Sequence, residues 1–208
     1  VLEHIPRPLE FLQQIREANG GGGRIYIEVP CLEWIINENA WYDLFYEHVN
    51  YFRLSDFRRI FGTIHLADHT FNGQYLSVVA DLAPLNVPDS MGAEVEFPDR
   101  LLASIGIHAS AIRSRRESKG LPTVIWGAAS KGVNFALQLE RAGVTVDGVV
   151  DINPAKQGRF LPGTGLRVLA PTEAISKFPA GTSVIVMNPN YLDEVVAASR
   201  GAFSCSTI

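Results

Sequence analysis

Hydrophobic residues recur along the first eighty positions at two spacings, which predict alternating helices and strands. Between residues 6 and 18 they are three or four positions apart, as on one face of a helix. Between residues 24 and 29 every second residue is apolar, which is typical of a half-buried strand. Two further strand patterns, 63–70 and 74–81, flank Asn72-Gly73, a dipeptide that favours a hairpin turn because both residues tolerate positive φ.

A short helix is expected between the strand patterns at 24–29 and 63–70, from Ser55 to residue 61. Ser55 is a typical N-cap, because its hydroxyl can accept a hydrogen bond from the first turn of a helix. Gly62 follows the last apolar residue of the pattern and is a typical helix stop.

A second alternation begins near residue 121, after a proline-containing stretch and a helix expected from Asp99 to about Lys119. A buried strand is followed by Gly127-Ala-Ala-Ser-Lys-Gly132, a helix, and a second strand that ends at Asp151. Strand, glycine turn, helix and strand, with an acid at the end, begin a βαβ nucleotide-binding unit. We therefore expect an α/β protein whose parts are residues 1–82, a linker and helix at 83–120, and residues 121–208.

The composition is that of an ordinary globular protein. Of 208 residues, 47% are hydrophobic and 19% are charged, with a net charge of −4, which excludes a disordered chain or a coiled coil. A dedicated nucleic-acid binder would be basic, and no apolar run approaches the roughly 18 residues that cross a membrane. Cys31 and Cys205 cannot form a disulfide framework or a tetrahedral zinc site alone, so a reducing, cytoplasmic location is expected.

The glycine turn is the first candidate binding site. Glycines between a strand and a helix let a phosphate approach backbone N–H groups at the positive end of the helix, and Lys131 adds a charge. Asp151 lies 19 positions after Gly132, about where an acid binds ribose in dinucleotide folds. From the spacing alone, a tight turn that only packs the helix on the strand is an equal alternative.

Histidines provide the other candidates. Glu47-His48 lies in an aromatic stretch and could supply a base near neutral pH, although a surface pair is the simpler interpretation of the dipeptide alone. His65 and His69 would share one face of a strand. No third or fourth ligand is obvious, so we predict no metal site.

Three separated blocks of the sequence, taken together, carry a resemblance to one family. The first comprises Val1-Leu-Glu-His-Ile-Pro and Gly22-Gly-Arg-Ile-Tyr-Ile-Glu-Val-Pro30, and the second is Phe45-Tyr-Glu-His-Val-Asn-Tyr-Phe52. The third joins the glycine turn to an Asp-x-Asn-Pro-x-Lys-x-Gly run at 151–158 and to residues 187–194. Together they resemble the S-adenosylmethionine (SAM)-dependent sugar C-methyltransferases. The first block resembles the back half of a class I methyltransferase, and the third resembles the second, Rossmann-like domain of that family.

The resemblance implies a reaction and a set of residues. SAM would donate a methyl group to a ring carbon of a nucleotide-linked deoxy-keto-sugar, after a base has removed the proton beside the ketone. Glu47 and His48 match the family's Glu-His pair, one of which would be the base or the enolate stabiliser. The family's tyrosine falls on Phe45 of this chain, and Tyr46 lies one position later. The cofactor pocket would be bordered by Leu2, Glu3 and His4. The nucleotide would lie against Gly127, Ser130, Lys131 and Asp151.

The resemblance also leaves parts of the family pattern outside these residues. The chain begins at Val1, and the glycine loop for SAM and the zinc module would precede it, so we interpret it as a fragment. Two alternatives remain: a non-catalytic sugar-nucleotide-binding module, favoured by Phe45, and a nicotinamide-dependent oxidoreductase, suggested by the glycine turn and Asp151. A nucleotide sugar is the expected partner, nucleic acid and membrane are not, and self-association stays open.

Overall fold

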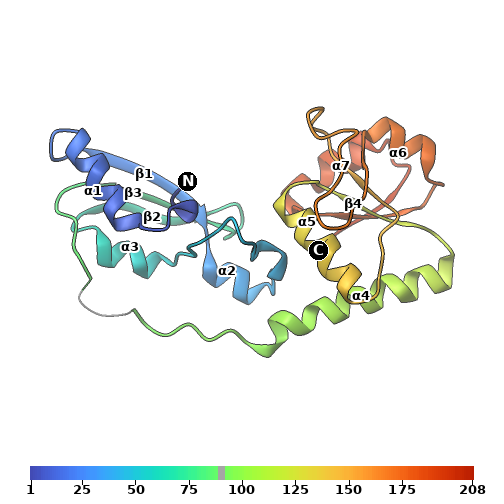
Figure 1. Cartoon of the computed structure of the whole chain (residues 1–208), viewed down its shortest axis with the longest axis horizontal. Helices are drawn as coiled ribbons and strands as arrows, with labels where there is room; N and C mark the ends of the chain where they lie inside the picture. The colour runs from blue at the N-terminus through green and yellow to red at the C-terminus, as the bar shows by residue number, and fades with distance from the viewer. Residues whose placement is uncertain (89–91) are drawn as a thin grey trace. The chain divides into compact units, whose positions relative to one another are not determined.

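The computed structural model describes residues 1–88 and 92–208, which form two compact units (Figure 1). Unit 1 comprises Val1–Ala40 and Tyr46–Asp99, and unit 2 comprises Trp41–Phe45 and Arg100–Ile208. Each unit is described by itself. The helix expected to connect the two parts belongs almost wholly to unit 2, and so does Trp41–Phe45, a segment whose neighbours on both sides belong to unit 1.

Unit 1 contains a three-stranded antiparallel sheet in the order β1 (Arg24–Pro30), β3 (Tyr75–Asp81) and β2 (Ile64–Thr70). Both outer strands run antiparallel to β3. The hairpin expected between β2 and β3 is confirmed, with positive φ at Asn72 and Gly73.

Four short helical segments accompany this sheet: the 3-10 turn η1 (Leu2–His4), α1 (Pro8–Ala18), α2 (Leu32–Asn37) and α3 (Leu54–Ile60). The Ser55 cap is wrong, because Ser55 lies inside α3 and Arg53 occupies the N-cap. The Asp56 carboxylate accepts a hydrogen bond from the Arg53 backbone N–H at 2.8 Å. An acid in the first turn of α3 therefore caps the N-terminus of its own helix.

The core of unit 1 joins two of these helices to the sheet. Leu12 of α1 and Phe57 of α3 are fully buried, and they belong to one cluster with the strand residues Val29, Leu76 and Val78. The packing of α1 and α3 holds the segments that precede and follow them, including the residues of η1.

Unit 2 contains a parallel five-stranded sheet. Its order is β6 (Val168–Leu169), β5 (Gly148–Val150), β4 (Thr123–Trp126), β7 (Ser183–Val186) and β8 (Ser204–Thr207). Every neighbouring pair of strands is parallel. All residues of β4, β5 and β7 are buried, as expected for the interior of an α/β sheet.

The helical segments of unit 2 are η2 (Trp41–Asp43), α4 (Asp99–Lys119), α5 (Ser130–Arg141), α6 (Pro171–Lys177), η3 (Pro189–Tyr191) and α7 (Leu192–Ala198). The bounds of α4 are those expected from the sequence. The strand expected to end at Asp151 is β5, a short strand that begins at Gly148 and ends at Val150. No helix of the described residues is long and apolar enough to cross a membrane.

Unit 2 has a separate hydrophobic core, and the molecule is of the expected α/β class. The cluster contains Val124, Val150 and Val184 from three neighbouring strands and Val195 from α7. Because β4 and β5 are held here, the turn that follows β4 and the acid that follows β5 are brought to the same edge of the sheet.

Candidate active site

The Tyr46-Glu47-His48 tripeptide lies in an irregular loop of unit 1 that precedes α3. The backbone N–H groups of Val49 and Asn50 both donate to the carbonyl oxygen of Glu3, at 2.9 and 3.1 Å. The Nδ1 atom of His4 lies 2.7 Å from the carbonyl oxygen of Glu47. The structure therefore brings residues predicted to border the cofactor together with residues predicted to catalyse.

The bond between His4 and Glu47 determines which nitrogen of His4 is available for chemistry. A backbone carbonyl oxygen only accepts hydrogen bonds, so Nδ1 of His4 carries the proton in this contact. In the neutral ring Nε2 then has a free lone pair, and it lies 3.6 Å from a carboxylate oxygen of Glu3. Glu3 would stabilise a proton accepted at Nε2, so His4 can act as a base.

His48 completes a cluster of ionisable side chains. Its ring lies 4.9 Å from the His4 ring, centroid to centroid, at an angle of 70°. The loop around it is only partly exposed, with Glu47 and His48 both half-buried. Two imidazoles and a carboxylate that are held close together can take up, hold and return a proton.

Tyr46 and the other aromatic residues of the loop lie in different surroundings. The Tyr46 side chain is 88% exposed, and Phe45 belongs to unit 2. The ring of Tyr51 lies 5.9 Å from the His48 ring, at an angle of 64°. Sequence reasoning did not single out Tyr51, although it belongs to the same motif block, and the catalytic role of Tyr46 stays a prediction.

Of the three residues predicted to border SAM, one is buried in the core and two keep part of their side chain exposed to solvent. Leu2 is 4% exposed and belongs to the hydrophobic core. The side chains of Glu3 and His4 retain 13% and 48% exposure. A carboxylate and an imidazole beside each other suit the positively charged sulfonium of SAM, so these two residues fit the group that the resemblance implies.

Among the described residues of unit 1, two groups of side chains lie close enough to share a metal ion. One group is Glu3, His4 and His48, and the other is Cys31, Glu33 and His69. The ligand atoms of each group lie within 4.8 Å of one another. The second group includes ligands that sequence reasoning did not find beside His69. Burial raises the pKa of the Cys31 thiol above its usual value, which works against metal binding because the thiolate is the ligand. His65 lies apart from His69 and pairs with Asp81 at 2.8 Å.

The glycine turn of unit 2 has the form that the sequence predicts, between β4 and α5. Gly127 has φ of 122°, and a Cβ at Gly132 would lie 1.8 Å from the Gly127 carbonyl oxygen. Both positions therefore need glycine for the close packing of the helix against the turn, which is the structural alternative that spacing left open.

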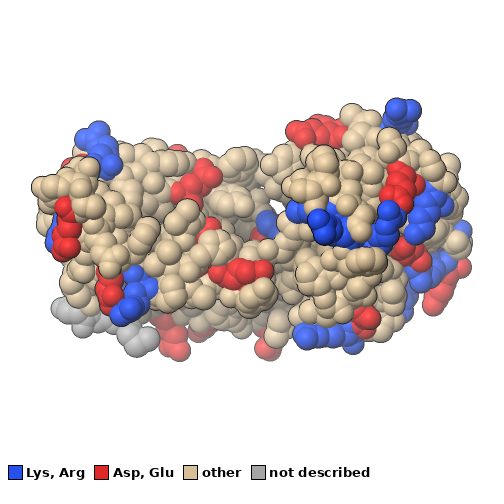
Figure 2. Space-filling view, turned by 45° about the horizontal axis from the view of Figure 1, so that its top comes forward, with Lys and Arg blue, Asp and Glu red and all other residues tan. Residues whose placement is uncertain are grey.

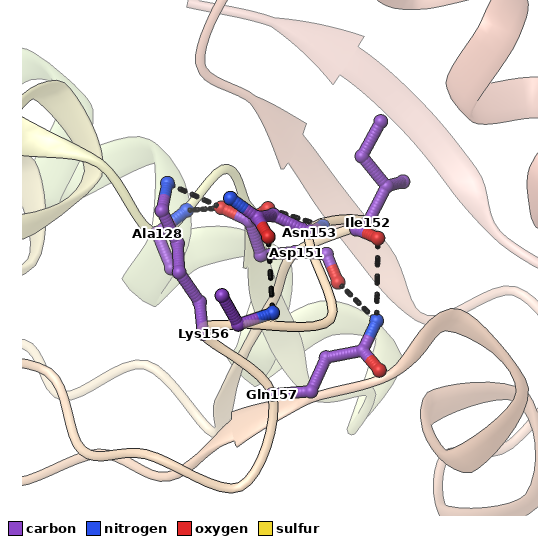
Figure 3. Close-up of polar contacts among 7 residues, drawn as sticks. Ala128, Asp151, Ile152, Asn153, Lys156 and Gln157 are labelled. Atoms are coloured by element: carbon purple, nitrogen blue, oxygen red, sulfur yellow. Dashed lines mark hydrogen bonds and ion pairs between the residues drawn. The ribbon is translucent and has the colours of Figure 1, made fainter.

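Asp151 closes this turn from the end of β5. One carboxylate oxygen accepts the Ala128 N–H at 2.8 Å and lies 3.1 Å from the Lys156 ammonium, and the other accepts the Asn153 N–H at 2.8 Å (Figure 3). Gln157 adds a bond to the Asp151 carbonyl oxygen at 3.0 Å. In the Asp-x-Asn-Pro-x-Lys-x-Gly run, the carboxylate of the first residue, Asp151, therefore accepts hydrogen bonds from later residues of the same loop.

This network determines the charge of Asp151. Burial opposes ionisation, but the hydrogen bonds from Asn153 and Ala128 and the nearby Lys156 hold the pKa of the carboxyl below its usual 3.8. Both of its oxygens accept hydrogen bonds from the protein. The geometry therefore gives no support to a ribose-binding role for Asp151 in a nicotinamide-dependent enzyme.

Lys131 and Ser130 lie at the start of α5. Ser130 is half-buried and opens the helix. The Lys131 ammonium lies 2.8 Å from an oxygen of Asp43, with side-chain exposures of 19% and 6% for the two residues. The structure thus places all four predicted substrate residues around one turn, while the charges of Lys131 and Asp151 are already matched within unit 2. Their binding of phosphate stays a prediction.

Comparison with known proteins finds family models that match two separate parts of the chain. Residues 1–68 match the model of a methyltransferase domain, and residues 107–205 match the model of a C-methyltransferase C-terminal domain. The first match includes both histidines of the cluster, and the second includes the glycine turn and Asp151. No curated protein shows significant similarity to the chain.

Proposed function

From the matches to methyltransferase family models over residues 1–68 and 107–205, we propose that the chain methylates a ring carbon of a nucleotide-linked deoxy-keto-sugar. The observation that carries the proposal is the hydrogen bond from His4 to the Glu47 carbonyl, which gathers two histidines and an acid in one place. Methylation of carbon beside a ketone needs such a base, because the carbon must lose a proton before it can attack a methyl group.

Methyltransferase domains of this kind generally use SAM, which supplies an electrophilic methyl group when bound. The chain's own residues would perform the proton transfer. Nε2 of His4 has the free lone pair, and the Glu3 carboxylate would stabilise the imidazolium that forms. His48 and Glu47 lie in the same loop, and one of them would accept the proton or hold the enolate oxygen.

The charge of the two units supports an anionic substrate. Unit 1 contains six Lys and Arg against fourteen Asp and Glu, a net charge of −8, whereas unit 2 contains twelve against eight, a net charge of +4. Basic side chains also predominate on the visible face of unit 2, the right-hand part of Figure 2. A positive unit attracts a nucleoside diphosphate, since opposite charge raises the local concentration of a ligand.

The proposal is tested by separating proton removal from methyl transfer. The protein is incubated in deuterated water with nucleoside diphosphate-linked keto-deoxysugars, with and without SAM. Wild-type protein should incorporate deuterium at the carbon beside the ketone and should methylate that carbon when SAM is present. His48→Ala and Glu47→Gln should each lower kcat by about 10²-fold or more, with a smaller change in KM.

His4→Asn provides a finer test, because an asparagine amide keeps a donor for the Glu47 carbonyl but removes Nε2. We expect this variant to keep substrate binding and to lose deuterium incorporation. Tyr51→Phe and Tyr46→Phe, compared side by side, report which tyrosine matters, and the position of Tyr51 predicts the larger effect there. Binding of the nucleotide sugar without either exchange or methylation would instead support a non-catalytic binding module.

A further inference from the structure

Cys31, Glu33 and His69 form a cluster of three potential metal ligands within unit 1, and none of them belongs to the candidate active site. Their ligand atoms lie within 4.8 Å of one another, and Cys31 Sγ lies 4.0 Å from a carboxylate oxygen of Glu33. Around a tetrahedral ion with bonds of about 2.0–2.3 Å, such atoms are about 3.3–3.7 Å apart. A small inward shift of the side chains would therefore let all three bind one ion.

The fold holds the two segments that carry these ligands against each other. Cys31 follows β1 as the N-cap of α2, and its backbone N–H donates to the carbonyl oxygen of Gln74 at 2.9 Å. Gln74 belongs to the turn between β2 and β3, and β2 carries His69. In the same turn, a Cβ at Gly73 would lie 3.2 Å from the Trp34 side chain of α2. The backbone thus brings the ligands together without any help from a metal.

The register of the sheet places His69 on the same side as Cys31. His69 is paired with Leu76 of β3, and Leu76 is paired with Val29 of β1. Residues that are directly opposite on antiparallel strands share a face of the sheet. Cys31 comes two positions after Val29 and keeps an extended backbone, with φ of −91° and ψ of 116°. Alternation along an extended chain therefore directs its side chain to that face as well.

The exposure of the three residues suits an ion that enters from solvent. Cys31 is only 1% exposed, whereas Glu33 and His69 are both exposed. The sulfur therefore lies on the protein side of the cluster. An ion can reach it past the two exposed ligands and keep its fourth position open to water.

The kinds of ligand atom favour Zn²⁺. Thiolate and imidazole suit Zn²⁺, whereas Mg²⁺ and Ca²⁺ take oxygen ligands. Burial, and also the negative charge of Glu33, raise the pKa of the Cys31 thiol, so an ion must displace the thiol proton to solvent. Coordination achieves this, because a thiol that binds such a cation is deprotonated. The Glu33 charge that opposes a free thiolate then attracts the cation.

We propose that Cys31, Glu33 and His69 bind one Zn²⁺ ion, with water as the fourth ligand, and that the ion fastens the β2–β3 hairpin to the start of α2. The ligands come from two segments that are far apart in the chain, so the ion joins them as a crosslink does. The site does not depend on the proposed function, because it shares no residue with the cluster of Glu3, His4 and His48.

Titration of the metal-free 208-residue chain with Co²⁺ tests the site, because a thiolate bound to Co²⁺ gives a charge-transfer absorption that oxygen and nitrogen ligands do not give. We expect this absorption in the wild-type chain, and we expect Zn²⁺ to abolish it with a dissociation constant of about 1 μM or less. His69→Gln and Glu33→Gln change exposed residues, so both should fold, and each should weaken Co²⁺ binding about tenfold or more.

Two matched variants serve as controls. His65→Gln removes the other histidine of β2, and Cys205→Ser removes the other thiol of the chain. Both should keep the absorption and the affinity of the wild type. The proposal is overturned if the wild-type chain gives no thiolate absorption, if His69→Gln and Glu33→Gln bind Co²⁺ as the wild type does, or if Cys205→Ser loses the absorption.

Amide hydrogen exchange measures the fastening itself. Saturating Zn²⁺ should slow exchange about tenfold or more over α2 and over the turn between β2 and β3, because an ion that binds only the folded arrangement opposes its opening. The same Zn²⁺ should have no such effect in His69→Gln, and α6 of unit 2 should exchange equally fast with and without the ion. Zn²⁺ binding that leaves the exchange of α2 unchanged would refute the fastening.

Discussion

The surroundings of a single side chain decide what its chemistry is used for. Asp151 has the place in the chain of a ribose-binding acid, yet its oxygens accept bonds from Ala128, Asn153 and Lys156. His4 belongs to the first motif block and is expected beside the cofactor, and its bond to the Glu47 carbonyl leaves Nε2 ready to accept a proton. Residue type and place in the chain therefore do not specify which partners a side chain meets.

Asp151→Ala is expected to destabilise unit 2. The substitution leaves the backbone N–H groups of Ala128 and Asn153 and the Lys156 ammonium without the carboxylate that accepts from them, at a cost of about 1 kcal/mol for each hydrogen bond lost. Because the folded pKa is below the usual 3.8, the stabilisation by Asp151 is present above that pH and is lost as pH falls through the folded pKa. Urea unfolding at neutral pH measures the effect. Glu194→Ala, at an exposed acid on α7, should leave stability nearly unchanged.

At the scale of elements, aromatic side chains of α4 and α5 pack around Trp41, in the segment Trp41–Phe45. His108 of α4 lies 5.5 Å from the Phe135 ring of α5 and 6.2 Å from the Trp41 ring, centroid to centroid. Burial lowers the pKa of His108 below its usual 6.5. Trp41 therefore lies beside a half-buried histidine whose neutral form is favoured by burial.

This histidine predicts a pH dependence of the stability of unit 2. Above about pH 6.5 the ring is neutral in both the folded and the unfolded chain, so the full stability is present. As pH falls below 6.5 the unfolded chain takes up a proton first, and stability declines until the folded pKa is passed. His108→Gln should flatten this decline in urea unfolding between about pH 5 and pH 8. The same change at exposed His69 should not.

At the scale of the whole molecule, each unit has a core of its own, and the two units differ in charge by sign. The glycine-rich stretch of unit 1, residues 20–23, follows α1 and precedes β1. It runs from a helix into a strand, so it offers no helix N-terminus to a cofactor. Glu3 and His4 would border SAM, but the glycine turn and acid that the resemblance implies are not found among the described residues of unit 1.

We therefore expect the 208-residue chain to bind SAM only weakly, with a dissociation constant above about 1 mM. Calorimetric titration with SAM measures it directly. Micromolar binding by the 208 residues would contradict this expectation and show that other residues of the chain hold the cofactor.

The sequence by itself determined the elements that depend on neighbouring residues. The bounds of α4, the β2–β3 hairpin at Asn72-Gly73 and the glycine turn were all predictable, because helix periodicity and turn conformation are set within a few positions. Even there, the cap of α3 was wrong, since Arg53 occupies the N-cap position expected for Ser55.

Only the tertiary structure decided the partners of the chemically important side chains. His4 meets Glu47 across 43 positions of the chain, and Lys131 meets Asp43 across 88. No local pattern specifies such pairs, because they form only when packing of the cores brings distant segments together. The same lysine that predicts a phosphate site from its place in a glycine turn is found paired with Asp43.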